Sequence, residues 1–320
     1  MNVVYWDGLS TAPPQLKSHV LTIGNFDGVH RGHRALIRRL LHLKKQLQRP
    51  AMAITFDPPP TAILRPHLLA EPLATLQQRV ADIAALGTDR ILVLQASRAL
   101  LEVSANAFFK ELLLEQLELK GIVEGRNFCF GKDRQGTITQ LQHWCHKEQL
   151  PCEVVDDVYR RRMRISSSTI REAIKRGDVE AARLGLGRPY SVTGKIVHGD
   201  HRGRTIGFPT CNLAEIATLV PATGVYAAEA VLGDRLFAGA VNIGPNPTFS
   251  IDARKVEAHL LGLAEEVYDQ SLTLRFLSRL RDTTRFSSVL ELQKQLDSDL
   301  KQTEQVYHDY IRRQPARPNR

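Results

Sequence analysis

The sequence predicts a doubly wound α/β domain over residues 1–186, followed by a mostly β, small-barrel domain over 187–310 that ends with a helix. Two observations carry this prediction. Up to about residue 186, short apolar runs alternate with stretches of helical period, which is typical of a parallel sheet covered by helices. After the segment GLGRPY, residues 185–190, the period falls to two, as in antiparallel strands. Residues 311–320 form a basic tail that we expect to be disordered.

The strands of the first domain are predicted from five apolar runs, each short enough to be buried on both faces. They cover residues 20–24, 51–56, 90–95, 121–124 and 152–158. Helical patterns fill the segments between them, among them residues 36–47 and 76–84, the second closed by Gly87. Ser104 is placed to cap a further helix. In sheets of this kind, ligands bind at the carboxyl ends of the strands.

The strands of the second domain alternate apolar and polar residues. They cover residues 191–197, 224–232, 235–243, 256–261 and 271–276. The pair Gly233-Asp234 predicts a tight hairpin turn between two of them. Many short strands within about 100 residues indicate a small barrel or sandwich. One helix closes the chain, with an apolar stripe that begins at Val289 and ends at Ile311.

The composition is that of a globular protein, with 43% hydrophobic and 24% charged residues. The formal net charge of +9 favours an anionic partner, and charge alone leaves nucleic acid, an anionic membrane and nucleotide phosphates open. Part of the excess is local, in YRRRMR at 159–164 and in the tail. The four cysteines form no C-x-x-C pair, and the N-terminus does not read as a signal peptide. We therefore expect a cytoplasmic protein that does not enter a membrane.

The segment LTIGNFDGVHRGH, residues 21–33, places two histidines directly behind a predicted strand. Residues 24–28 should form the first βα loop, with the helix beginning near His30. The exposed N–H groups and the positive dipole at a helix start attract phosphate. His30 and His33 lie on one face of the first turn, and Gly32 leaves room for a ligand close to the backbone. Two imidazoles can donate hydrogen bonds to phosphate oxygens, more strongly if they are protonated.

These residues also carry a family resemblance. GNFDGVHRGH resembles the H-x-G-H signature of the nucleotidyltransferase superfamily, in the form typical of bacterial FMN adenylyltransferases. RISSSTIR, residues 164–171, resembles the family's I-S-S-T-x-I-R, with a serine as its third hydroxyl, and FDPPP and GRNFCFG resemble its nucleotide- and flavin-side loops. The resemblance implies a Rossmann-like fold and adenylyl transfer assisted by His30 and His33. The implied ATP and phosphate contacts are Gly24, Asn25, Phe26, Asp27, Gly28, Arg164, Ser167, Ser168 and Arg171, and the implied flavin-side contacts are Asp57, Pro58 and Asn127.

A second motif lies in the predicted barrel. GDHRGRT looks like a phosphate loop, but its glycine spacing and its arginine do not fit a Walker A motif. Instead, GKIVHGDHRGRTIGFPTCN, residues 194–212, resembles the riboflavin kinase signature, with Cys211 in place of the usual alanine. The resemblance implies Mg²⁺ as cofactor, with Thr210 as its ligand. The implied ATP and Mg²⁺ contacts are Gly199, Gly203, Arg204, Gly207, Thr210 and Asn212.

The segment VEAHLL, residues 256–261, supplies the candidate base. Period two puts Glu257 and His259 on one face of a strand and the apolar residues on the other. A carboxylate there can accept a proton from a hydroxyl, and the resemblance makes Glu257 the base for attack on the γ-phosphate of ATP. The family's late R-x-E-x-x-F run reads RDTTRF here, with Thr283 in place of the acid, which leaves Arg281 as a flavin-side candidate.

Together the resemblances cover residues 20 to 310 and indicate a bacterial bifunctional riboflavin kinase/FAD synthetase acting on riboflavin, FMN and ATP. An adenylyltransferase for another phosphorylated small molecule would share the histidines but would not need the second domain. A basic nucleic-acid-binding protein is the non-enzyme alternative, and the aromatic content of 6% is low for base stacking. We therefore expect small-molecule substrates and no nucleic acid. The sequence does not predict the oligomeric state.

Overall fold

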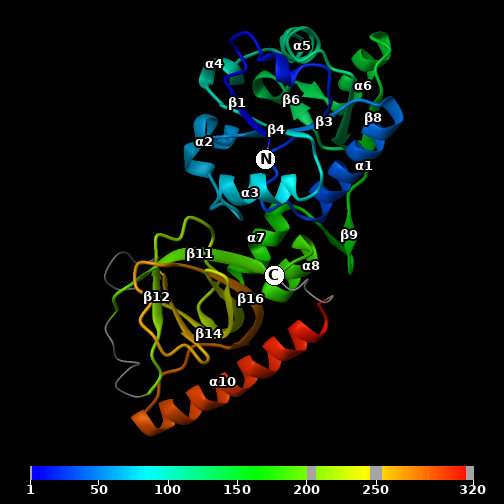
Figure 1. Ribbon diagram of the computed structural model, residues 1–320. Helices are drawn as coiled ribbons and strands as arrows, with labels where there is room; N and C mark the ends of the chain where they lie inside the picture. The colour runs from blue at the N-terminus through cyan, green and yellow to red at the C-terminus, as the bar shows by residue number, and fades with distance from the viewer. Residues whose placement is uncertain (1, 200–206, 246–253, 315–320) are drawn as a thin grey trace. The chain divides into compact units, whose positions relative to one another are not determined.

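A computed structural model of the chain describes residues 2–199, 207–245 and 254–314 (Figure 1). It contains two compact units, Met1–Ser167 and Ser168–Arg320. Helices α7 (Ser167–Lys175) and α8 (Val179–Leu186) precede the predicted domain boundary at 186, yet they belong almost entirely to the second unit. The boundary at which the two activities separate therefore stays a prediction.

The first unit is built on a six-stranded parallel sheet, as predicted. From β2 the chain adds β3 and β4 on one side of this strand, and later β5 and β8 on its other side. The strand order therefore reverses between β2 and β5. The edge strand β1 has no counterpart among the predicted runs. In spatial order the strands are β1 (Val3–Trp6), β4 (Arg90–Leu94), β3 (Ala51–Phe56), β2 (Val20–Ile23), β5 (Gly121–Gly125) and β8 (Cys152–Val155).

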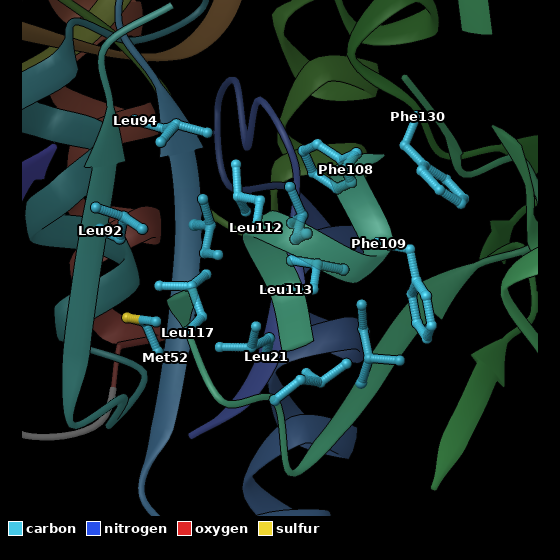
Figure 2. Close-up of a cluster of buried hydrophobic side chains, with 14 of the residues drawn as sticks. Leu21, Met52, Leu92, Leu94, Phe108, Phe109, Leu112, Leu113, Leu117 and Phe130 are labelled. Atoms are coloured by element: carbon cyan, nitrogen blue, oxygen red, sulfur yellow. The ribbon is translucent and has the colours of Figure 1, made fainter. Parts of the chain in front are cut away.

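Two helical layers cover this sheet, because alternate strand residues face opposite sides. Leu21 and Met52 belong to the cluster drawn in Figure 2, together with Phe109 and other side chains of η3. Side chains of α6 complete this cluster. Ala53 and Val93 face the other side, against α1 and α3. Ser104 caps the helical segment before η3, as expected, and η3 itself has π-helical geometry. The helices are α1 (Arg31–Leu47), α2 (Pro60–Leu64), α3 (Leu76–Ala84), α4 (Arg98–Leu101), α5 (Ala105–Ala107), η3 (Phe108–Gln116) and α6 (Ile138–Lys147).

Short hairpins and turns complete the first unit. Strands β6 (Cys129–Phe130) and β7 (Gly136–Thr137) pair with each other, as do β9 (Tyr159–Arg160) and β10 (Met163–Arg164). Three 3-10 turns, η1 (Pro14–Leu16), η2 (Pro66–Leu68) and η4 (Lys132–Arg134), lie in the loops. The four cysteines of the chain are all free.

The second unit is a closed six-stranded antiparallel barrel, which confirms the predicted class. Gly233, with φ +57°, lies in the two-residue turn between β13 and β14, so the predicted hairpin is confirmed. Strand β12 begins with the last two residues of the riboflavin kinase-like motif. Around the barrel the strands are β11 (Tyr190–Val197), β12 (Cys211–Ala214), β15 (Arg254–Leu260), β14 (Arg235–Pro245), β13 (Gly224–Leu232) and β16 (Ser271–Arg281).

Helix α10 (Val289–Arg312) closes the chain and contacts β13, β14 and β16. The prediction for Val289 is wrong: its side chain is 59% exposed, since it stands at the first turn, and the buried residues of the helix are the polar Asp299 and Thr303. The helix also takes in the first two residues of the predicted tail, whereas residues 315–320 lie outside the described ranges. Among the helices in the described ranges, each is too short or too polar to cross a bilayer.

Candidate active sites

The loop between β2 and α1 has an unusual backbone at the carboxyl edge of the parallel sheet. Phe26, Gly28 and Val29 all have positive φ, of 48°, 78° and 40°. Two of the three are not glycine, so the loop holds conformational strain of the kind that clusters at functional sites. Gly24 still donates its N–H to Ile54 of β3, at 3.0 Å. The loop is therefore a rigid extension of the sheet at the point where the sequence predicts phosphate binding.

His30 and His33 lie together at the start of α1. Their rings stack with centroids 3.6 Å apart, and His30 is the N-cap, its Nδ1 accepting the backbone N–H of His33 at 3.3 Å. Because that nitrogen accepts, the ring proton of a neutral His30 is on Nε2. Burial lowers the pKa of His33 well below its usual value, and His30 and Arg79 lower it further. His33 is therefore neutral at neutral pH, not the protonated donor considered from the sequence.

Gly32 was expected to leave room for a ligand close to the backbone, but the structure gives it a different neighbour. A Cβ at Gly32 would lie 3.0 Å from Cε1 of the His30 ring, so this glycine makes room for the histidine. The His33 Nδ1 atom is buried and has no hydrogen-bond partner among the described residues. A buried polar atom without a partner is costly, and a ligand oxygen would satisfy it.

Two charged side chains hold the loop between β2 and α1, here called the histidine loop, in place. Asp27 was predicted from the sequence, and Arg79 was not. The Asp27 carboxylate accepts the backbone N–H groups of Leu73, at 2.9 Å, and Ala74, at 3.2 Å. Arg79 of α3, which the sequence analysis missed, is 6% exposed and donates to the carbonyls of Asn25, at 2.8 Å, and Phe56, at 3.0 Å. Burial lowers the pKa of Arg79, while Asp27 and Asp57 oppose this shift.

The remaining predicted contacts of this unit lie on neighbouring loops. The Phe26 side chain is fully buried in the core and reaches the site only as the edge-on neighbour of His33. Asp57 and Pro58 are exposed directly after β3. Asn127 and Arg164 come together on Asp157, which accepts from the Asn127 amide at 3.5 Å and from Arg164 at 2.8 Å.

The serine motif begins where α7 begins. Ser167 Oγ donates to the carbonyl of Asp27 at 3.0 Å, so the motif is hydrogen-bonded to the histidine loop. Ser168 and Arg171 follow on the first turns of α7. The loop, the histidines and Ser167 thus form one connected group.

Glu124 is a buried carboxyl group that the sequence analysis did not single out. It is 1% exposed on β5, beside the switch in strand order, and accepts the N–H of Ile23 at 2.6 Å. Burial raises the pKa of Glu124 well above its usual value. Backbone pairing between β2 and β5 ends at Leu21. Beyond that point the Glu124 side chain links the two strands through its bond to Ile23.

The second site is a cavity of about 410 Å³ between the barrel and α10. Asn212, Glu257 and Asn242 form a row across the adjacent strands β12, β15 and β14, and all three line the cavity. The predicted faces of β15 are confirmed: Val256, Ala258 and Leu260 are buried on the opposite side. The row therefore presents a carboxylate between two amides to the cavity.

Glu257 has three polar neighbours in the cavity wall. Lys255, two residues earlier on the same strand face, lies 3.0 Å from the carboxylate, and the Asn242 amide donates to it at 3.4 Å. The Asn212 Oδ1 atom is buried without a hydrogen-bond partner in the part of the chain that the structure describes. His259 Nδ1 lies 2.7 Å from the carbonyl of Pro209 and ties β15 to the segment that leads into β12.

The glycines of the kinase-like motif differ in what they do. A Cβ at Gly199 would lie 2.1 Å from the Asn212 side chain, so a glycine is required for Asn212 to take its place. Gly207 has φ +90°, a conformation that suits glycine. Gly203 and Arg204 lie outside the described residues.

A smaller cavity of about 210 Å³ adjoins the first, because Thr210 lines both. Its wall is mostly apolar, with Leu260, Val267 and Tyr268, and the Tyr268 ring stacks on His198 at 3.8 Å. Thr210 therefore connects the smaller cavity with the larger one, which Glu257 lines.

Arg281 lines the large cavity beside Thr283, as a flavin-side residue would. Its guanidinium makes a two-pronged ion pair with Asp299 of α10, at 2.7 and 2.9 Å, and Gln295 also donates to that carboxylate at 2.9 Å. Asp299 is 2% exposed. The pair fixes the wall formed by α10, and sequence patterns did not predict it.

Comparisons with known proteins match two families to successive parts of the chain. A family described as FAD synthetase matches residues 12–169, and a family described as riboflavin kinase matches residues 186–307. The chain is 34% identical to the bifunctional riboflavin kinase/FMN adenylyltransferase of Escherichia coli (strain K12), over 91% of this chain and 93% of the relative. It is also 34% identical to the protein of that name from Pseudomonas fluorescens, over 92% and 94%. A crystal structure titled macrolide-efflux protein, from Streptococcus pneumoniae, superimposes with a TM-score of 0.87 at 28% identity, over 95% of this chain and 99% of that one.

Proposed function

The chain belongs to the family of bifunctional riboflavin kinase/FMN adenylyltransferases, and we propose that each of its two units performs one of these reactions with the residues described above. The barrel phosphorylates riboflavin with ATP, and the α/β unit adenylylates the resulting FMN to give FAD and pyrophosphate. An adenylyltransferase for another small molecule would not need the kinase-like cavity.

In the kinase reaction, riboflavin occupies the larger cavity and ATP the smaller one. The shared Thr210 places the γ-phosphate beside the row that contains Glu257. Glu257 takes the proton of the riboflavin hydroxyl as the oxygen attacks the γ-phosphorus, and the electron pair of the broken bond leaves on ADP. Lys255 keeps the carboxylate oriented before the reaction.

Mg²⁺ fits the same end of the cavity. The Asn212 Oδ1 atom and the Thr210 hydroxyl are oxygen donors, which Mg²⁺ prefers, and the ion is usually held by one or two protein oxygens together with substrate phosphates. In the described ranges no group of three acidic, histidine or cysteine side chains forms a separate metal site. The ion would neutralise charge on the transferring phosphoryl group.

In the adenylyltransferase reaction, the FMN phosphate attacks the α-phosphorus of ATP and pyrophosphate leaves, so no enzyme nucleophile is needed. His30 and His33 donate hydrogen bonds to the phosphate oxygens as negative charge shifts to the leaving group. Support comes from their stacked placement at a helix start and from the buried, unpartnered nitrogen of His33. Asp27 and Arg79 hold the loop rigid and are positioning residues.

The row of Asn212, Glu257 and Asn242 beside two cavities is the observation that carries the proposal. The direct test incubates the protein with riboflavin, ATP and Mg²⁺ and separates the flavins over time. We expect FMN first and FAD later, with riboflavin, FMN and ATP as the small-molecule substrates. Absence of FMN would refute the kinase assignment, and absence of FAD from added FMN would refute the other.

Two fragments test the division of labour. One starting near Arg188, as the sequence boundary suggests, should phosphorylate riboflavin but make no FAD. One starting at Ser168 retains α8, whose Glu180 accepts a hydrogen bond from Ser278 of the barrel at 2.5 Å, so it should be the more stable fragment. The cytoplasmic location expected from the sequence stays a prediction.

A further inference from the structure

The β9–β10 hairpin of the α/β unit carries a charge cluster that the proposed function does not use. Four of its six residues are arginines, and Arg160, Arg161, Arg162 and Arg164 are all exposed. Arg164 pairs with Asp157. The other three have no carboxylate within ion-pair distance in the described part of the chain. The charge of this hairpin is therefore largely uncompensated.

The tip of the hairpin is strained. Arg160 pairs with Met163, so Arg161 and Arg162 form a two-residue turn, and their φ angles are 46° and 64°. Turns with positive φ at both central residues strongly favour Asn-Gly or Gly-Gly, because a side chain with a full Cβ is disfavoured there. A solvated basic surface needs no arginine at these two positions. The strain therefore points to a role for the two guanidinium groups.

The hairpin leads directly into the adenylyltransferase site. Arg164 is two residues from Arg162, about 7 Å along a strand. The carbonyl of the next residue, Ile165, lies 3.7 Å from the position of a Cβ on Gly32, between the two histidines. Ser167 then bonds to the histidine loop at 3.0 Å. The arginines thus extend from a segment anchored where the phosphates are proposed to bind.

We propose that Arg161 and Arg162 at the tip of this hairpin bind a polyphosphate chain, the triphosphate of ATP or the pyrophosphate product, at the mouth of the adenylyltransferase site. The planar guanidinium fork binds phosphate oxygens in pairs, which a lysine ammonium does not do. The inference rests on the proposed adenylyltransferase function. A nucleic acid would offer similar charges, but the segment continues into the loop that we propose binds the phosphates of ATP.

The test replaces both arginines with the pair that the turn prefers, Arg161→Asn with Arg162→Gly, in the full-length protein. The KM for ATP is measured in FAD synthesis and the KM for pyrophosphate in the reverse reaction, at low and high salt. We expect a rise of about ten-fold in at least one KM, corresponding to loss of a charge-assisted hydrogen bond. A higher KM for ATP would identify the triphosphate as the bound group, and a higher KM for pyrophosphate would identify the product. The unfolding temperature should stay the same or rise, since the strain is relieved.

Two further variants act as controls. Arg161→Lys with Arg162→Lys keeps the charge but not the fork and should recover part of the lost affinity. Lys45→Gln with Arg49→Gln removes the same charge at the far end of α1, at the opposite edge of the sheet, and should leave both KM values unchanged. If the Asn-Gly variant fails to fold, Arg161→Gln with Arg162→Gln takes its place.

Unchanged KM values for both phosphates in a folded variant would overturn the proposal. Weakened binding of a single-stranded oligonucleotide with both KM values unchanged would also overturn it, in favour of a nucleic-acid surface. Failure of the wild-type protein to make FAD would instead refute the proposed function on which the inference rests. Riboflavin phosphorylation, which uses the other unit, provides the internal standard in every assay.

Discussion

Replacing Asp299 with asparagine should loosen the wall of the kinase cavity and destabilise the barrel unit. The wild-type carboxylate is 2% exposed and accepts three hydrogen bonds from Arg281 and one from Gln295. Removing one partner of a buried ion pair costs about 3–5 kcal/mol, because the other charge stays buried without compensation. The Arg281 side chain is 22% exposed and regains some hydration, so we expect the lower end, about 3 kcal/mol.

Thermal unfolding followed by circular dichroism measures this effect. A loss of about 3 kcal/mol lowers the unfolding temperature of a domain of this size by roughly 6–12 °C. The KM for riboflavin should rise, while FAD synthesis from added FMN should be unchanged below the transition. The double variant Arg281→Met with Asp299→Leu removes both charges and should recover most of the stability. An Asp299→Asn protein that unfolds at the wild-type temperature would refute the reasoning.

Four other substitutions test the two sites and the buried carboxyl group of Glu124. Glu257→Gln should lower FMN formation by about 10²–10⁴-fold and spare FAD formation from added FMN, and unchanged phosphorylation would reassign the base. His30→Ala and His33→Ala should each cost about 2.7–4 kcal/mol in the rate of FAD synthesis, forward and reverse, with little change in ATP binding, and a folded double variant with the wild-type rate would contradict their role. The raised pKa of Glu124 makes the native state hold a proton that the unfolded chain releases, so wild-type stability falls as the pH rises above about 4.5 toward the native pKa. Glu124→Gln should therefore gain stability over the wild type as the pH rises through that range, and parallel urea-denaturation curves from pH 4.5 to 8 would contradict this.

The fold was largely predictable because its strands are buried in simple patterns. The runs at 51–56 and 224–232 coincide with β3 and β13, since period and apolar content leave little choice there. Strand β1 was missed because it is a four-residue edge strand without a clear period. The π-helical geometry of η3 was also missed, since a shift in helical hydrogen bonding leaves no mark on an apolar pattern.

The positions of the candidate site residues could be predicted where the chemical motif and the local structure share one segment. The histidine loop and the Glu257 strand are of this kind, since a motif and its periodicity place them. Arg79 and Asp299 could not be predicted, because each looks like a solvated helix residue until long-range packing buries it against a partner. The neutral state of His33 has the same origin: burial, and not spacing, decides it.

The closed ring of the barrel also determines how the second unit opens. Strand β13 is hydrogen-bonded to β14 along its whole length and to β16 on its other side, so its amides should exchange with deuterium last. Strand β12 pairs with each neighbour over only three residues, which makes it the weakest seam of the ring. Asn212 lies in that seam, so substrate phosphates bound there would hold β12 to its neighbours. Binding would then slow amide exchange throughout the barrel, and the stability of the second unit would depend on whether the site is occupied.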